Sequence, residues 1–131
     1  MKSNNVVQEK AFRFGVRIVK LYRYLYKGPN LLPLLNQILG CGTAIGANIE
    51  EAIGGVSKKE FIVKMQIAYK EARETRYRLR LLIEAGEIEL KLGNSVVHDC
   101  EELLKIMTSI LNTSRQHPSL QYQQNAFIIN H

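Results

Sequence analysis

The residues of this sequence that could bind a ligand by charge are concentrated near the N-terminus. Between Met1 and Gly28 there are seven lysines and arginines but only one acidic residue, Glu9, and the rest of the chain is balanced, so this segment carries the whole net charge of +6. At the helical period of about 3.6 residues, most of these bases share one face. A concentrated basic face favours polyanionic partners such as RNA or DNA, although a solvated helix surface has the same pattern. This face, the first basic stripe, consists of Lys10, Arg13, Arg17, Lys20, Tyr24 and Lys27.

A second basic group lies in the middle of the chain. Arg73, Arg76 and Arg80 are spaced by three and four residues, so a helix places them on one stripe beside Tyr69. Lysines and arginines that contact phosphates give an affinity that is mostly independent of base sequence and that falls as salt rises. Tyr24 and Tyr69 could stack on unpaired bases, but tyrosines in helical bundles more often serve packing. Both basic groups are therefore candidate nucleic-acid contacts.

No catalytic or metal-binding constellation is apparent in the sequence. The three histidines are scattered, and no pair of Cys, His or acidic residues has the spacing of a metal site on an inward helix face. Gly40, Gly42 and Gly46 follow no strand and precede no Lys-Ser/Thr pair, so they match neither a dinucleotide fingerprint nor a phosphate-binding loop. We therefore expect a protein that is not an enzyme and that needs no cofactor and no metal.

The two cysteines indicate a reduced compartment. Cys41 and Cys100 are too few for a disulfide framework, and the N-terminus lacks the pattern of a secretory signal. A cytoplasmic protein is expected on these grounds. Cys100 falls on the apolar side of a predicted helix and is expected to be a small buried residue rather than a nucleophile.

The segment from Leu31 to Ile49 contains no charged residue and allows two interpretations. A membrane span needs about 20 strongly apolar residues, whereas this segment is interrupted by a proline, by polar residues and by glycines. A helix buried inside a bundle is the better interpretation, with Gly42 and Gly46 allowing a neighbouring backbone to come close. Asn48 flanks its apolar side and is predicted to hydrogen-bond across helices and fix their register, in preference to contacting a ligand. The predicted apolar seam is Leu32, Leu35, Leu39, Gly42, Gly46, Ile49 and Ile53.

Three further helices are predicted from similar spacings of three and four apolar residues. The first covers residues 5–27, and its predicted seam is Val7, Ala11, Phe14, Ile18, Leu21 and Leu25. The third covers residues 58–85 and begins at a capping box, in which Ser57 accepts from an early backbone N–H and Glu60 reaches back to the Ser57 amide. The fourth follows a hinge at residues 87–93 and is capped by Asn94 or Ser95. The third and fourth predicted seams are Phe61, Met65, Ala68, Ala72, Thr75, Leu79 and Leu82, and Val97, Cys100, Leu104, Met107 and Leu111.

These helices predict an all-α fold, an antiparallel up-down-up-down four-helix bundle over residues 1–115. Residues 116–131 lose the helical period and are predicted to be a flexible tail. Ala68 and Ala72 are expected to face the glycines of the second helix. The first helix also has a surplus apolar flank, formed by Phe12, Val16, Val19 and Tyr26, which favours a subunit interface.

Several motifs together resemble the four-helix-bundle family that is also called the 23S rRNA intervening sequence protein family. They are an N-I-x-E core, then S-x-x-E-F, then E-A-x-E-T-x-Y, and the similarity covers roughly residues 7 to 113. One departure is that Leu39 and Gly40 stand where the family often has basic residues. The segments that carry the resemblance are Gln37 to Ala52, Gly54-Gly55, Ser57 to Phe61, Glu71 to Tyr77 and Leu79 to Leu82.

The resemblance implies a bacterial protein that assembles into a homo-oligomeric ring, a homopentamer. A related family member, the accessory variability determinant of diversity-generating retroelements, looks like a basic ring that binds nucleic acid and a reverse transcriptase. The resemblance therefore implies the same kinds of partner for this chain. The leading hypothesis is therefore a non-enzymatic oligomeric bundle that binds RNA, DNA or a nucleoprotein through its basic helices. The alternative is a protein–protein scaffold whose arginines pair with acidic partner surfaces, without nucleic-acid binding. No membrane association is expected.

Overall fold

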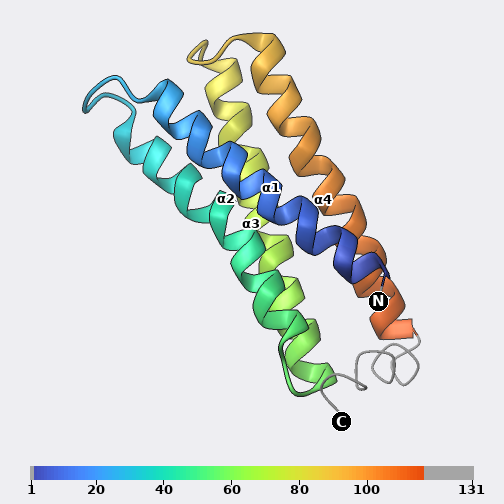
Figure 1. The fold of residues 1–131 in the computed structure, drawn as a ribbon. Coiled ribbons are helices and arrows are strands. Elements are labelled where there is room, and N and C mark those ends of the chain that lie inside the picture. The colour runs from blue at the N-terminus through green and yellow to red at the C-terminus, as the bar shows by residue number, and fades with distance from the viewer. Residues whose placement is uncertain (1, 117–131) are drawn as a thin grey trace.

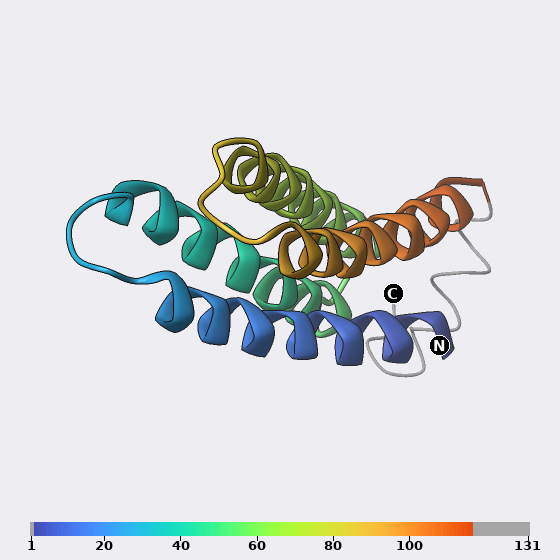
Figure 2. The ribbon, with the colours of Figure 1, turned by 90° about the horizontal axis from the view of Figure 1, so that it is seen from above.

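The computed structural model describes residues 2–116 and confirms the all-α class and the four-helix bundle (Figure 1). Its helices are α1 (Lys2–Leu25), α2 (Leu32–Ile53), α3 (Lys58–Glu84) and α4 (Leu90–Gln116), and the described residues contain no strand. Successive helices run antiparallel, and α1 lies beside both α2 and α4 (Figure 2). The tail was predicted over residues 116–131; Gln116 is the last residue of α4, and the rest of the predicted tail lies outside the described residues.

The core is built from the apolar faces that spacings of three and four residues create in α1 and α3. In α3 the buried residues from Phe61 to Leu82 are the predicted seam without exception. In α1 the predicted seam residues from Val7 to Leu21 are buried and Leu25 packs at the edge of the core. Because each large aliphatic side chain removed from water contributes about 1.5–3 kcal/mol, these faces determine how the helices pack.

The predicted seam of α2 was partly wrong. Leu39 and Gly46 are only half-buried, whereas Ile38 and Ile45 are fully buried. Since α2 packs against both α1 and α3, its buried arc is broad, and an almost uniformly apolar helix does not reveal the centre of that arc. The buried residues of α2 are Leu35, Ile38, Cys41, Gly42, Ile45, Ile49 and Ala52.

The glycines of α2 approach α1, not the alanines of α3 as predicted. A Cβ added at Gly42 would lie 2.9 Å from Cγ1 of Ile18, and one added at Gly46 would lie 3.5 Å from the Ala11 carbonyl oxygen. Ile18 and Ala11 both belong to the buried face of α1. The small residues therefore serve the close α1–α2 contact.

The polar side chain of Asn48 also differs from its prediction. Its Nδ2 donates to the Ala44 carbonyl, one turn earlier in the same helix, at 2.9 Å. Because this local acceptor is available in any helix, a half-buried asparagine needs no partner on another helix. Asn48 therefore does not fix the register of two helices.

The start of α3 contains the predicted capping interaction. The Glu60 N–H donates to Ser57 Oγ at 3.0 Å, but the Glu60 carboxylate accepts from the Val56 N–H at 2.9 Å rather than from the Ser57 amide. At the other end, Gly86 has a φ of 74°, and the N–H of Glu87 donates to the Leu82 carbonyl at 2.9 Å. This bond and the positive φ define a Schellman ending, which only glycine adopts without strain.

The fourth helix begins at Leu90, earlier than the predicted cap at Asn94 or Ser95. Gly93 lies inside the helix, and a Cβ there would lie 2.6 Å from Cγ1 of Ile83 on α3. Tertiary packing of α4 on α3 therefore sets the helix start and overrides the local preference of glycine for a loop. The buried face is also rotated from the predicted one. It comprises Gly93, Val96, Cys100, Leu103, Met107, Ile110, Leu111 and Ser114.

The uncharged segment forms most of α2 inside the bundle, as predicted. Each helix within residues 2–116 is too short or too polar to cross a bilayer.

Candidate nucleic-acid interface

The N-terminal half of the first basic stripe lies against α4. Arg17 Nη1 is 2.6 Å from Asp99 Oδ2, and its Nη2 donates to Ser95 Oγ at 2.9 Å. Lys10 Nζ is 3.3 Å from Glu102 Oε2. Since the two acids belong to α4, these ion pairs join α1 and α4 and neutralise both cations.

The remainder of the stripe is less compensated. Arg13 is paired with Glu9 on α1 itself, with 2.6 Å between Nε and Oε2. Lys20 and Lys27 are exposed and have no carboxylate partner within residues 2–116. The six predicted positions therefore do not form one uniformly positive surface, because charge is left unpaired only towards the C-terminal end of α1.

A larger basic site lies in the groove between α3 and α4. The groove has a volume of about 830 Å³ and brings together Arg73, Arg76 and Arg80 from one helix. These arginines occupy one side of α3 because their spacing of three and four residues returns to the same face at each turn. The remaining lining residues are Tyr77 from α3 and His98, Glu101, Glu102, Leu104 and Lys105 from α4.

The two acids of the groove are already engaged. Glu101 Oε2 is 2.8 Å from Arg76 Nε, and Glu102 pairs with Lys10 on the far side of α4. This leaves Arg80 and Lys105 without a carboxylate within residues 2–116. Both side chains are exposed, so the groove is open to solvent and positively charged.

Arg73 has no carboxylate partner within residues 2–116 and lies near a neutral phenol. The Arg73 guanidinium, followed by the Thr108 hydroxyl, lowers the pKa of Tyr69. Because a neutral phenol leaves the guanidinium charge uncompensated, Arg73 adds a third positive charge to the groove. Tyr69, for which packing was the favoured interpretation over base stacking, packs against the core.

Sequence reasoning did not identify three residues of this groove. Tyr77 follows Arg76 directly and was noted only as part of a motif. His98 and Lys105 are seven residues apart, so they share one face of α4. That spacing was a usable signal, but it became meaningful only when α4 was placed against the arginine side of α3.

The predicted apolar flank is exposed on the other side of the molecule. Phe12 is 68% exposed, and Val16 and Val19 also face solvent. They line a shallow groove of about 380 Å³ between α1 and α2, whose floor contains Gly15 and Gly46. Tyr26, the fourth residue of the predicted flank, lies outside this groove and stacks on Tyr22, so the flank divides into two parts.

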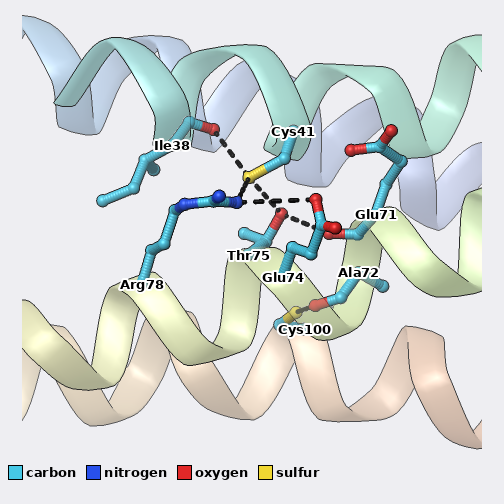
Figure 3. Close-up of polar contacts among 8 residues, drawn as sticks. All are labelled: Ile38, Cys41, Glu71, Ala72, Glu74, Thr75, Arg78 and Cys100. Carbon is cyan, nitrogen blue, oxygen red and sulfur yellow. Dashed lines mark hydrogen bonds and ion pairs between the residues drawn. The ribbon is translucent and has the colours of Figure 1, made fainter. Parts of the chain in front are cut away.

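The buried cysteines contribute to packing and not to a reactive site (Figure 3). Cys41 Sγ lies 3.0 Å from Thr75 Oγ1 and 3.6 Å from Arg78 Nη1. Cys100 Sγ donates to the Ala72 carbonyl at 3.2 Å, and burial raises the pKa of the Cys100 thiol to about 12. A thiol that holds its proton this strongly is a poor nucleophile. Within residues 2–116 there is also no group of three or more His, Cys, Asp or Glu side chains that could hold a metal ion.

Comparison with known proteins agrees with the resemblance found in the sequence. A solved structure of a protein of unknown function from the S23 ribosomal protein family of Bacteroides thetaiotaomicron is 43% identical, with a TM-score of 0.81. The similarity covers 85% of this chain and 99% of that one. No curated protein matches this chain. The model of the 23S rRNA-intervening sequence protein family matches residues 3–109, and the chain belongs to that family.

Proposed function

We propose that the protein is a non-enzymatic, oligomeric helical bundle that binds nucleic acid, or a nucleoprotein, through basic helix faces. The α3–α4 groove is its main contact, and the unpaired end of the first basic stripe is secondary. A cytoplasmic location is part of this proposal, since it fits two free cysteines and a nucleic-acid partner.

One observation carries the proposal: three cations in one groove have no carboxylate partner within the described residues. Arg73, Arg80 and Lys105 line an open groove whose two acids are already paired, Glu101 with Arg76 of the same groove and Glu102 with Lys10 of α1. Unpaired, exposed cations close together raise the local positive potential and attract phosphates, from which they release bound counterions.

Assembly into a homo-oligomer is the second part of the proposal. Phe12, Val16 and Val19 form an exposed apolar face beside small residues that admit a partner's side chains. Covering such a face is favourable in proportion to the apolar area removed from water. We take a second copy of the chain as its occupant, and the family resemblance favours a ring of five. A ring would also repeat the basic groove on every subunit and so multiply a weak affinity.

A protein–protein scaffold is the alternative function. The same arginines could pair with acidic surfaces of a partner such as a reverse transcriptase, because guanidinium groups bind carboxylates as well as phosphates. The two functions differ in their response to nucleic acid alone. A scaffold would bind neither RNA nor DNA in the absence of its protein partner.

The test is a titration of labelled RNA or DNA by fluorescence anisotropy over a series of salt concentrations. Replacing Arg73, Arg80 and Lys105 together with Gln should weaken binding. It should also make the slope of log K against log salt shallower by about 2, since each contact with a single-stranded phosphate contributes about 0.7. The control removes the same charge from Arg23, Lys59 and Lys91, which are exposed and lie outside the groove. Equal loss in both variants, or no binding by the wild type at low salt, would overturn the proposal.

A further inference from the structure

An exposed tyrosine stands among the cations of the α3–α4 groove. Tyr77 is 60% exposed and lies on α3 between Arg73 and Arg80 in the lining of the groove. It neither belongs to the hydrophobic core nor packs against it, unlike Tyr22 and Tyr69. Leaving so large a ring in water forfeits the free energy of its burial. Packing therefore does not account for this aromatic residue.

The opposite wall of the groove is suited to a flat ligand. His98 and Leu104 of α4 supply an exposed imidazole and a half-buried aliphatic side chain. Along α3 the aromatic Tyr77 thus lies between Arg73 and Arg80, and along α4 Leu104 directly precedes Lys105. A ligand that is planar in one portion and anionic in the neighbouring portions matches this arrangement, and a nucleotide has that chemistry.

The spacing of the charges fits a short piece of one strand. Arg73 and Arg80 are seven residues apart, which corresponds to about 10 Å along α3. With long, flexible side chains at both ends, that span reaches the phosphates on either side of one or two nucleotides. Lys105 can hold the backbone from the α4 side.

We propose that the α3–α4 groove binds unpaired nucleotides, with Tyr77 stacking on a base while Arg73, Arg80 and Lys105 hold the flanking phosphates. This inference rests on the proposed function and deepens it, because it names single-stranded nucleic acid as the ligand. In a duplex the bases are stacked on one another and cannot reach a tyrosine in a recess between two helices. Single-stranded binding combines phosphate contacts with base–aromatic stacking, and this groove holds side chains suited to each of the two contributions.

The experiment separates stacking from charge in the full-length protein. Labelled oligouridine and oligothymidine, which do not pair with themselves, and a duplex of the same length are titrated by anisotropy. Tyr77→Leu is expected to weaken single-strand binding by about five- to a hundredfold, the equivalent of one lost base stack. The salt slope should stay unchanged, and Tyr77→Phe should restore most of the affinity. Comparison of the two oligonucleotides shows whether the groove prefers RNA or DNA.

The matched control is Leu90→Ala, which removes an equally exposed large apolar side chain at the start of α4, outside the groove and outside the first basic stripe. That variant should bind single strands as the wild type does. The inference is overturned if Tyr77→Leu retains wild-type affinity or if the duplex binds as tightly as the single strands. In either case, the variant with glutamine in place of Arg73, Arg80 and Lys105 is then compared with the wild type. If that variant still loses affinity, the proposed function stands and only the inference about single strands fails. If the wild type binds none of the probes, both fail.

Discussion

Asp99 of α4 accepts a charged hydrogen bond from Arg17 of α1, with 2.6 Å between Oδ2 and Nη1. The two side chains are 33% and 44% exposed, so solvent weakens the attraction between them but does not separate the pair. Together with the pair between Lys10 and Glu102, it connects the first and last helices of the bundle. Residues that look like a ligand-binding stripe in the sequence therefore close the bundle along the seam between α1 and α4.

This role predicts that Arg17 matters for stability and not for nucleic-acid binding. Arg17→Gln and Asp99→Asn should each destabilise the bundle, and a double-mutant cycle should give a coupling free energy of about 0.5–1 kcal/mol, typical of a partly exposed pair. Urea unfolding of the four proteins measures this coupling. Anisotropy with RNA should give wild-type affinity for Arg17→Gln. A large loss of affinity would instead return Arg17 to the binding surface.

Replacing each glycine of α2 with alanine is expected to change the stability of the bundle by a different amount. At Gly42 a Cβ would lie 2.9 Å from Ile18, so alanine there should cost about 1–3 kcal/mol of stability through overpacking. At Gly46 the nearest atom is 3.5 Å away, which accommodates a Cβ but not the larger side chain of leucine. At Gly40 nothing lies within 4 Å, so alanine should stabilise the helix by up to about 1 kcal/mol.

The measurement is the free energy of unfolding for Gly40→Ala, Gly42→Ala, Gly46→Ala and Gly46→Leu. Gly40→Ala controls for helix propensity, since it changes the backbone preference without creating a contact. The expected order of stability is Gly40→Ala, then Gly46→Ala, then Gly42→Ala, with Gly46→Leu also strongly destabilised. Equal effects at Gly40 and Gly42 would show that α1 does not approach α2 as closely as described.

The buried face of a helix could be predicted from the sequence wherever that helix has one clearly apolar face. The seam of α3 was predicted residue by residue because charged side chains occupy most of its other positions. In α2 the absence of charge removed that contrast, so the predicted seam was partly wrong and the predicted partner of its glycines was wrong. At the start of α4, Gly93 looks like a loop residue, and only its approach to Ile83 explains why it lies in a helix.

The candidate site was predicted less completely than the fold. Arg73, Arg76 and Arg80 share a stripe by spacing alone, so their common placement follows from the helical period. Which charges remain free depends on acids far away in the chain, such as Asp99 opposite Arg17, and on how α4 is rotated against its neighbours. Since ion pairs between helices depend on tertiary packing, no local pattern could separate the neutralised N-terminal half of the first basic stripe from the open groove.

Burial of the Cys100 thiol predicts low reactivity in the folded protein. Its pKa is raised from the ordinary value of 9.0 to about 12, chiefly by desolvation. At pH 8 a thiol-specific reagent should therefore modify Cys100 only as fast as the bundle opens, and should modify it at once in urea. Mass spectrometry of quenched samples locates the label, and immediate labelling of Cys100 in the native protein would contradict its burial.

The raised pKa of Cys100 also makes the stability of the folded protein depend on pH, and stability falls as pH rises in the alkaline range. Because the folded state keeps the proton that the unfolded chain releases, the stabilisation is complete below pH 9 and is lost as pH rises towards about 12. Cys100→Ala should be less stable at neutral pH, since it leaves a small cavity. The difference in unfolding free energy between wild type and variant should shrink above pH 9. A constant difference would mean that the thiol ionises alike in both states.

The apolar face of α1 predicts an oligomer that a single charge can disrupt. Phe12 is the most exposed residue of that face and lies over the groove that contains Gly15 and Gly46. Phe12→Glu should dissociate the assembly without unfolding the subunit, because the side chain contributes little to the subunit's own core, whereas an unpaired carboxylate buried in an interface is costly. Light scattering should give a mass well above the 15.0 kDa of one chain for the wild type and close to it for the variant.

The control for this last prediction is Leu90→Glu, which places the same charge at an exposed leucine where α4 begins. That variant should keep the wild-type mass, since Leu90 is remote in sequence from the α1–α2 face and does not line its groove. Circular dichroism establishes that both variants remain helical. A wild-type protein that scatters as a single chain at micromolar concentration would contradict the oligomer, and an assembled Phe12→Glu variant would place the interface on another face. Because a ring would multiply the groove's affinity, Phe12→Glu should also bind long single strands more weakly, while binding to an oligonucleotide that spans one groove stays unchanged.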